Sequence, residues 1–206
     1  MKSKTAKPSQ NGTMKKNKRN NGESEPGIAQ GLRRLFVNEL QNIYWVEIAI
    51  NKAIPKLIKK ATAVILVEAL TRHLDVSKEH VTKLEEVFSS IGEKVEPKKC
   101  KSMLGLIKEA KEIMKKIETE MIRDVAIILA VQKVEHYEIA TYGTLCSFAK
   151  TLGETYVTSL LHEILEQEKA AGKKLYEIAE SFIIGETAGI EKVENTTFSI
   201  LESNRK

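Results

Sequence analysis

Two glutamates, Glu135 and Glu138, interrupt an apolar helical pattern that runs from about Ile122 to Ala149. Residues three and four positions apart share one face of a helix, and here that face comprises Ile128, Val131, Glu135, Glu138, Tyr142 and Leu145. Because the rest of this face is suited to a core, both carboxylates are predicted to be buried. A buried carboxylate without a partner is costly, so it shifts its pKa, pairs with a cation or binds a metal ion. The pattern therefore predicts a carboxylate site inside the protein.

A matching interval links further candidate residues. Glu47 and His80 are 33 positions apart, and so are Glu135 and Glu168. Each interval joins an acid in one long predicted helix to a candidate ligand on the antiparallel helix that follows. Carboxylate oxygens and imidazole nitrogens can together hold a pair of divalent ions, which need bridging carboxylates. The repeated interval favours one site shared between helices, although neither half contains a Glu-x-x-His motif.

The other reactive side chains carry weaker signals. His73 lies seven positions before His80 on the same side of its predicted helix, and either imidazole could equally be a hydrogen-bonded core or boundary residue. His162 falls off the apolar stripe of its helix and is predicted to face solvent. Cys146 has no histidine or acid arranged in sequence to activate it, so it is interpreted as a small core residue.

Five helical segments position these residues. The apolar periodicity predicts helices over residues 27–59, 64–91, 100–119, 122–150 and 154–183, and Gly92 is expected to end the second. Only 11 glycines and 4 prolines occur among 206 residues, as is typical of long helices. The segment 100–119 is interpreted as a helical crossover that lets the second and third bundle helices run parallel. The predicted fold is all-α: a ferritin-like antiparallel four-helix bundle with an extra crossover helix between helices two and three.

The net charge of +5 resides in the first thirty residues, which hold seven Lys or Arg and two acids. Residues 1–26 have almost no apolar side chains and are predicted to form a disordered basic tail. The helical domain is expected to span 27–183, and a flexible tail is expected over 184–206. The basic tail is interpreted as a solubilising segment, with weak, salt-sensitive association with nucleic acid as the alternative.

Composition also excludes several classes of protein. No apolar run approaches the roughly 18 residues of a membrane-spanning helix, so no membrane partner is expected. The two cysteines have neither metal-ligand spacing nor a disulfide framework, which favours a reducing, cytoplasmic compartment. There is no glycine-rich phosphate loop.

Several segments resemble the YciE/YciF-type family of ferritin-like bacterial stress proteins. They lie between about Gly31 and Glu180 and comprise residues 35–40, 44–47, 80–88, 99–107, 132–140 and 168–171. The resemblance implies a di-metal-like site in an antiparallel bundle, a homodimer and stress-linked expression in the cytoplasm. Carried onto this chain, the implied metal ligands are Glu47, His80, Glu135, Glu138 and Glu168.

Two positions depart from the pattern of that family. Val76 and Gly172 stand where the family usually has acids, one turn before His80 and one turn after Glu168 respectively. Both changes remove carboxylates from the inward side, so the implied site is at most degenerate or mononuclear.

Three hypotheses about function follow from these observations. The first is a stress protein that binds iron or manganese and handles oxygen or peroxide. The second is a structural or interaction dimer, not an enzyme, that has kept the fold and lost the metal. The third is nucleic-acid association through the basic tail. The sequence does not decide whether the chain is an enzyme.

Overall fold

Within the part of the chain that the computed structural model describes, residues 27–203 for the backbone and 27–182 for the side chains, every element is an α-helix. The elements are α1 (Ile28–Ile58), α2 (Val64–Ser90), α3 (Lys101–Lys116), α4 (Glu120–Thr151) and α5 (Thr155–Ser203). The predicted all-α class is therefore confirmed. The predicted basic tail, residues 1–26, lies outside the described residues, and so does any contact it makes with nucleic acid.

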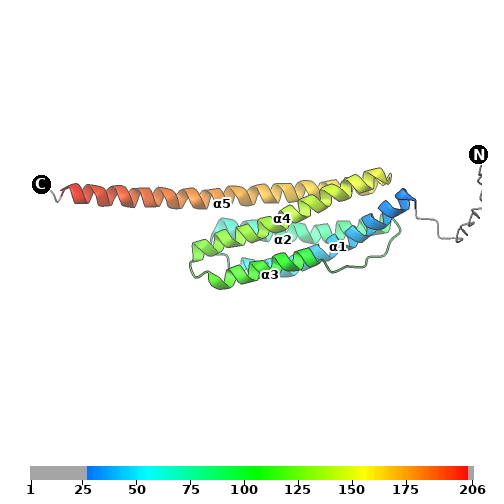
Figure 1. Cartoon of the computed structure of the whole chain (residues 1–206), viewed down its shortest axis with the longest axis horizontal. Coiled ribbons are helices and arrows are strands. Elements are labelled where there is room, and N and C mark those ends of the chain that lie inside the picture. The colour runs from blue at the N-terminus through cyan, green and yellow to red at the C-terminus, as the bar shows by residue number, and fades with distance from the viewer. Residues whose placement is uncertain (1–26, 204–206) are drawn as a thin grey trace, which may run out of the picture.

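Four of the helices form the bundle. α1 packs antiparallel to α2, and α4 packs antiparallel to α5, while α2 also contacts α5 and α1 contacts α4 (Figure 1). The shorter α3 lies along α4 and runs opposite to it, so the chain returns to the end of the bundle where α2 began before α4 starts. As a result α2 and α4 run in the same direction, as the predicted crossover requires.

Two glycines end helices by adopting positive φ angles. Gly92 (φ 70°) follows α2, and Gly153 (φ 79°) follows α4. In each case the next residue donates its N–H to a carbonyl five positions back: Glu93 to Phe88 and Glu154 to Ala149, both at 3.0 Å. These are the bonds of a Schellman cap, in which a residue with a Cβ would be strained. The predicted role of Gly92 is confirmed.

A buried acid from α4 caps the start of α2. Asp124 is 1% exposed, and its carboxylate accepts hydrogen bonds from the Thr62 N–H, the Thr62 hydroxyl and the Ala63 N–H at 2.7–3.2 Å. Ala63 is the N-cap residue of α2 and has no side chain that could accept these bonds. Asp124 therefore provides an acceptor for the Thr62 and Ala63 amides at the start of α2 and ties the α1–α2 connection to α4.

One predicted boundary differs from the structure. The fourth bundle helix was expected to end at Ile183, with a flexible tail from residue 184, whereas α5 continues as helix to Ser203. Residues after Ile183 still include helix-forming Ala, Glu, Lys and Ile, and no proline interrupts them, so loss of apolar periodicity alone does not end the helix. Within the described residues, no helix is long and apolar enough to cross a membrane.

Candidate metal centre

The predicted acidic face of α4 points into the middle of the bundle. Glu135 and Glu138 are both 0% exposed, and the apolar and aromatic residues on the same face are buried as well. Four-residue and three-residue steps along α4 bring these side chains toward α1, α2 and α5. The predicted burial of both carboxylates is confirmed.

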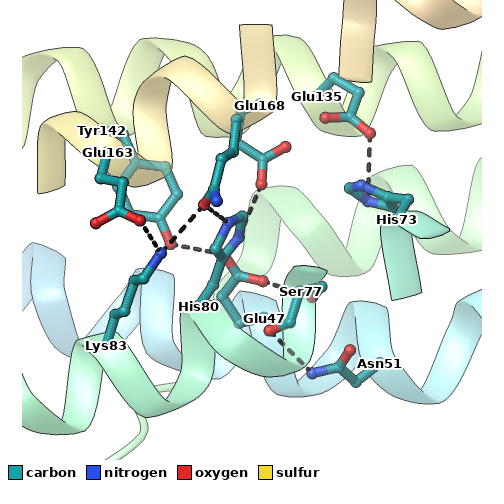
Figure 2. A network of polar contacts seen from close by, with 11 residues as sticks. Glu47, Asn51, His73, Ser77, His80, Lys83, Glu135, Tyr142, Glu163 and Glu168 are labelled. Atoms are coloured by element: carbon teal, nitrogen blue, oxygen red, sulfur yellow. Dashed lines mark hydrogen bonds and ion pairs between the residues drawn. The ribbon is translucent and has the colours of Figure 1, made fainter. Parts of the chain in front are cut away.

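Glu47 of α1 faces them and is held by two hydroxyl groups. The Tyr142 hydroxyl on α4 donates to Glu47 Oε1 at 2.6 Å, and the Ser77 hydroxyl on α2 donates to Glu47 Oε2 at 2.6 Å. Glu47 is itself 0% exposed. Its carboxylate is therefore fixed in orientation by residues from two other helices (Figure 2).

His80 of α2 lies between two carboxylates. Its Nδ1 atom is 3.2 Å from Glu47 Oε1 and 3.0 Å from Glu168 Oε1, while its Nε2 atom is 2.9 Å from Gln167 Oε1. Burial by itself lowers the pKa of His80, but hydrogen bonds with Glu168 and Glu47 outweigh it and raise this pKa to about 10. Without a metal ion His80 is thus a buried cation that neutralises part of the acidic charge.

The second half of the site comprises Glu135 and the ligand side chains around it, while Glu47 and His80 belong to the first half. His73 Nε2 lies 3.3 Å from Glu135 Oε1, and His73 is 8% exposed. Burial lowers the pKa of His73, so its imidazole is neutral at pH 7, the form in which histidine binds metals. Ligand atoms of His73, Glu135, Glu138 and Glu168 all lie within 4.8 Å of one another.

Glu168 of α5 belongs to both halves. Ligand atoms of Glu47, His80 and Glu168 form a second group that also lies within 4.8 Å. In Figure 2 the Glu168 carboxylate lies between His80 on one side and the Glu135–His73 pair on the other. A carboxylate shared by two donor groups has the place that a bridging ligand takes in a two-metal site.

Three carboxylates of this centre are poorly supplied with hydrogen-bond donors. Glu138 has no donor on either oxygen among the described side chains, while Glu135 and Glu168 each face only a histidine nitrogen, from His73 and His80 respectively. Asp124 is equally buried, yet it accepts four hydrogen-bond contacts. Native proteins rarely leave buried carboxylates so short of hydrogen-bond donors, because the solvation lost on burial is then not replaced.

The electrostatics of the cluster also indicate that these carboxylates need a compensating cation. Burial, together with the neighbouring Glu168, raises the pKa of Glu135 and of Glu138 well above that of a free glutamate. Four acids packed this closely cannot all be ionised unless cations compensate them. The residues present therefore fit a divalent cation, with oxygen and imidazole nitrogen donors of the kind that iron and manganese accept.

The structure brings all five predicted site residues into this one cluster, each of them at most 1% exposed. It adds His73, which was left out of the predicted set because its position in the sequence does not separate a core imidazole from a ligand. The seven-residue interval to His80 was the available signal, since it equals two helical turns. Gln167 and Ser77, which hold the ligand side chains, carry no such signal. His162 is exposed, as predicted, whereas Cys146 is half-buried and not a full core residue.

The two departures from the family pattern border this cluster. Gly172 is buried on α5, and a Cβ placed there would lie 3.8 Å from the Glu135 Cβ, at ordinary contact distance. Val76 is half-buried and lines a cavity of about 580 Å³ between α2 and α5. His73, Glu135 and Gln167 line the same cavity, so the second half of the site borders it.

Comparison with known proteins places the fold and the cluster in context. Residues 31–188 match the family described as a domain of unknown function, DUF892, and this span contains every residue of the cluster. The chain is 38% identical over 146 residues to protein YciF of Escherichia coli (strain K12), which covers 70% of this chain and 88% of that protein.

Solved structures agree with this match. The structure of the E. coli stress protein YciF superimposes with a TM-score of 0.71 at 37% identity, covering 74% of this chain and 96% of that one. The structure of YcfI from Rhodopseudomonas palustris gives 0.70 at 38% identity, covering 74% and 98%. A Xanthomonas campestris protein gives 0.61 at 18% identity, covering 80% and 99%, and this similarity concerns the fold alone.

Proposed function

This chain belongs to the DUF892 family, and we propose that it is a ferritin-like stress-response protein that binds iron or manganese in its bundle core. The E. coli relative is described as a stress protein, which supports the physiological part of the proposal. We also propose that the protein is a cytoplasmic homodimer, in line with the resemblance seen in its sequence.

One observation carries the metal-binding part. Three buried glutamates, Glu135, Glu138 and Glu168, face each other from α4 and α5, and among the described side chains their only nearby donors are two histidine nitrogens. Elsewhere the same chain satisfies a buried acid fully, at Asp124. The contrast supports a missing cation as the partner of the three glutamates.

Each donor group would serve one cation position. Glu47, His80 and Glu168 would hold one, and His73, Glu135, Glu138 and Glu168 would hold the other. Iron or manganese bound there would supply Lewis-acid and redox chemistry toward oxygen or peroxide. Because carboxylates are absent at Val76 and Gly172, we propose that the centre is a reduced form of a two-metal site.

The chain's own residues prepare this centre. Gln167 Oε1 accepts the Nε2–H of His80 and fixes its ring, so that Nδ1, which is protonated without metal, would present its lone pair to a cation held beside Glu47 and Glu168. Tyr142 and Ser77 fix both oxygens of Glu47. The buried face of α4 excludes bulk water from the first half, while the cavity beside Val76 admits small molecules to the second.

A structural dimer without metal remains the second candidate, and the ion pairs of His80 favour it. Protonated His80 contacts both Glu47 and Glu168, so half of the centre is closed by charge compensation within the chain. A protein that had lost its metal would keep this arrangement.

Metal analysis of matched variants separates the two candidates. The full chain is treated with chelator, loaded with Mn²⁺ or with Fe²⁺ under argon, desalted and analysed by inductively coupled plasma mass spectrometry. Wild type should retain close to one metal ion or more per chain, Glu168→Gln should retain almost none, and Glu166→Gln, an exposed substitution on the same helix, should match wild type. Metal content below about 0.2 per chain in wild type would refute the metal proposal, because metal-centre chemistry needs near-stoichiometric occupancy.

A further inference from the structure

A second cavity lies between α1, α3 and α4, and it shares His73 and Val131 with the cavity beside Val76. Its volume is about 450 Å³, within the range of small-molecule sites in proteins. Apolar side chains form its walls, and those that carry the argument are Trp45, Ala53, Leu57, Leu104, Ile107 and Met114. α3 lies along α4 (Figure 1). The lining residues extend from Trp45 on α1 to Lys60 just after it, and from Leu104 to Lys115 on α3, so the cavity is an elongated groove.

The rim of this groove carries charge of one sign. Five exposed lysines line it, namely Lys52, Lys56 and Lys60 on α1 and Lys111 and Lys115 on α3. No Asp or Glu lines the groove. Among the described side chains, none of the five lysines forms an ion pair, whereas lysines elsewhere on these helices and on α4 do, as Lys108 pairs with Glu112 and Lys133 with Glu109. The rim therefore has uncompensated positive charge around an apolar interior.

We propose that this groove binds a single long-chain fatty carboxylate. The acyl chain lies along the apolar walls between α1 and α3, and the carboxylate is bound by the lysines of the rim. Burying methylene groups supplies affinity in proportion to chain length, and the ammonium groups select a negative head group. His73 of the candidate metal centre also lines this groove, but the proposed ligand contacts are made by the apolar walls and the rim lysines.

Charge argues against a second copy of the chain as the occupant. In a two-fold symmetric dimer the same patch meets itself, so a dimer formed at this groove would bring its ten rim lysines together. Like charges placed opposite each other cost binding energy. The opposite holds for an anionic amphiphile, which supplies both the apolar surface and the negative charge that the groove lacks.

Trp45 gives a direct readout, because it is the only tryptophan in the chain and it lines the groove. The full chain is titrated with octanoate, decanoate and dodecanoate below their critical micelle concentrations while Trp45 fluorescence is followed. We expect saturable binding that tightens by about tenfold for each two added methylenes. Decyltrimethylammonium, with a matched tail and a cationic head, should bind at least tenfold more weakly than decanoate, and acetate should not compete.

Two variants test the contributions of the apolar walls and of the lysine rim separately. Ala53→Phe fills the groove and should abolish binding while all five lysines remain. The double variant Lys56→Glu/Lys111→Glu reverses charge on both sides of the rim and should weaken decanoate binding at least tenfold. Lys173→Glu, an exposed charge reversal on α5 outside the groove, is the control and should bind like wild type. All substituted lysines are exposed, and circular dichroism melts confirm that each variant is folded.

Three outcomes would overturn the proposal. One is equal affinity for decanoate and decyltrimethylammonium. Another is a dimer, measured by light scattering, that Ala53→Phe converts to monomer, because a second copy would then occupy the groove. The third is sedimentation with phosphatidylglycerol vesicles that the Lys56→Glu/Lys111→Glu variant loses, with no saturable binding of free dodecanoate, because the face would then contact a membrane surface.

Discussion

The Tyr142 hydroxyl on α4 donates a 2.6 Å hydrogen bond to Glu47 on α1, although the two residues are 95 positions apart. Burial, reinforced by Glu47, raises the pKa of Tyr142 well above its ordinary value, so the phenol is a hydrogen-bond donor at neutral pH. This bond joins the two helical hairpins at the candidate metal centre.

Removing that donor should destabilise the protein. Tyr142→Phe leaves Glu47 Oε1 buried with His80 as its remaining partner, and the cost of an unsatisfied buried acceptor is about 1–3 kcal/mol. Urea unfolding of the chelator-treated protein at pH 7 measures the loss. The matched control is Tyr156→Phe. The Tyr156 side chain is exposed and its hydroxyl donates to Glu86, so this variant should change stability by less than about 0.5 kcal/mol. Equal effects of the two variants would contradict a special role for the Tyr142 bond.

His80 should make the metal-free protein lose stability as pH rises. Its folded-state pKa is raised to about 10 from 6.5, so the folded protein holds a proton that the unfolded chain has lost between these values. The stabilisation is fully present below about pH 6.5 and disappears as pH approaches 10. Unfolding of wild type and His80→Gln, measured from pH 6 to pH 10, should show a stability difference that shrinks with rising pH. A difference independent of pH would show that His80 is not charged in the fold.

Metal uptake should release protons. At pH 7 the His80 pKa of about 10 leaves a proton on this cluster, the raised pKa values of Glu135 and Glu138 favour their protonated forms, and metal ligands must be deprotonated. Addition of Mn²⁺ to a weakly buffered, chelator-treated sample should therefore acidify it, and the affinity for Mn²⁺ should fall as pH decreases from 7 to 5. Indicator dye absorbance measures the protons, with Glu168→Gln as the blank. Binding without proton release would mean that the cluster is fully ionised before metal arrives.

Gly172→Asp should strengthen metal binding. The Cβ of the new side chain would lie 3.8 Å from the Glu135 Cβ, so a carboxylate fits beside the second donor group without a clash. We expect at least tenfold tighter Mn²⁺ binding in a chelator competition and lower stability of the metal-free protein, because one more buried acid lacks a partner. Ser159→Asp, exposed on the same helix and outside the cavity, controls for the added charge and should leave affinity unchanged. No gain in affinity would indicate that the missing acid at Gly172 does not limit the centre.

Loss of the Asp124 carboxylate should lower the stability of the fold without reducing metal binding. Asp124→Ala leaves the Thr62 and Ala63 amides without their acceptor, and the expected loss is about 2–4 kcal/mol. Asp75→Ala, an exposed change on α2, should cost less than about 0.5 kcal/mol. Metal content per folded chain should be the same in all three proteins, and a parallel loss of metal in Asp124→Ala would show that the cap also positions the site.

The helices and the acidic cluster were predictable because periodicity reports which residues share a face. Glu135 and Glu138 follow the same three- and four-residue steps as their buried neighbours, so their burial was predicted directly. His73 was not assigned, because a histidine at the edge of an apolar stripe is compatible with either a boundary or a ligand. The Asp124 cap could not be predicted, since the N–H groups that donate to it lie 61 and 62 positions away on another connection. The end of α5 was misplaced because helix propensity continues where the apolar pattern stops.

The position of Glu168 within both donor groups has a thermodynamic consequence. A cation at either position draws on the same carboxylate, so the two binding equilibria are not independent. Linkage then requires reciprocity: whatever factor the first ion imposes on the affinity of the second, the second imposes on the first. Titration curves of this protein with a divalent ion should accordingly be cooperative, positively or negatively, and Glu168 is the residue through which the coupling acts.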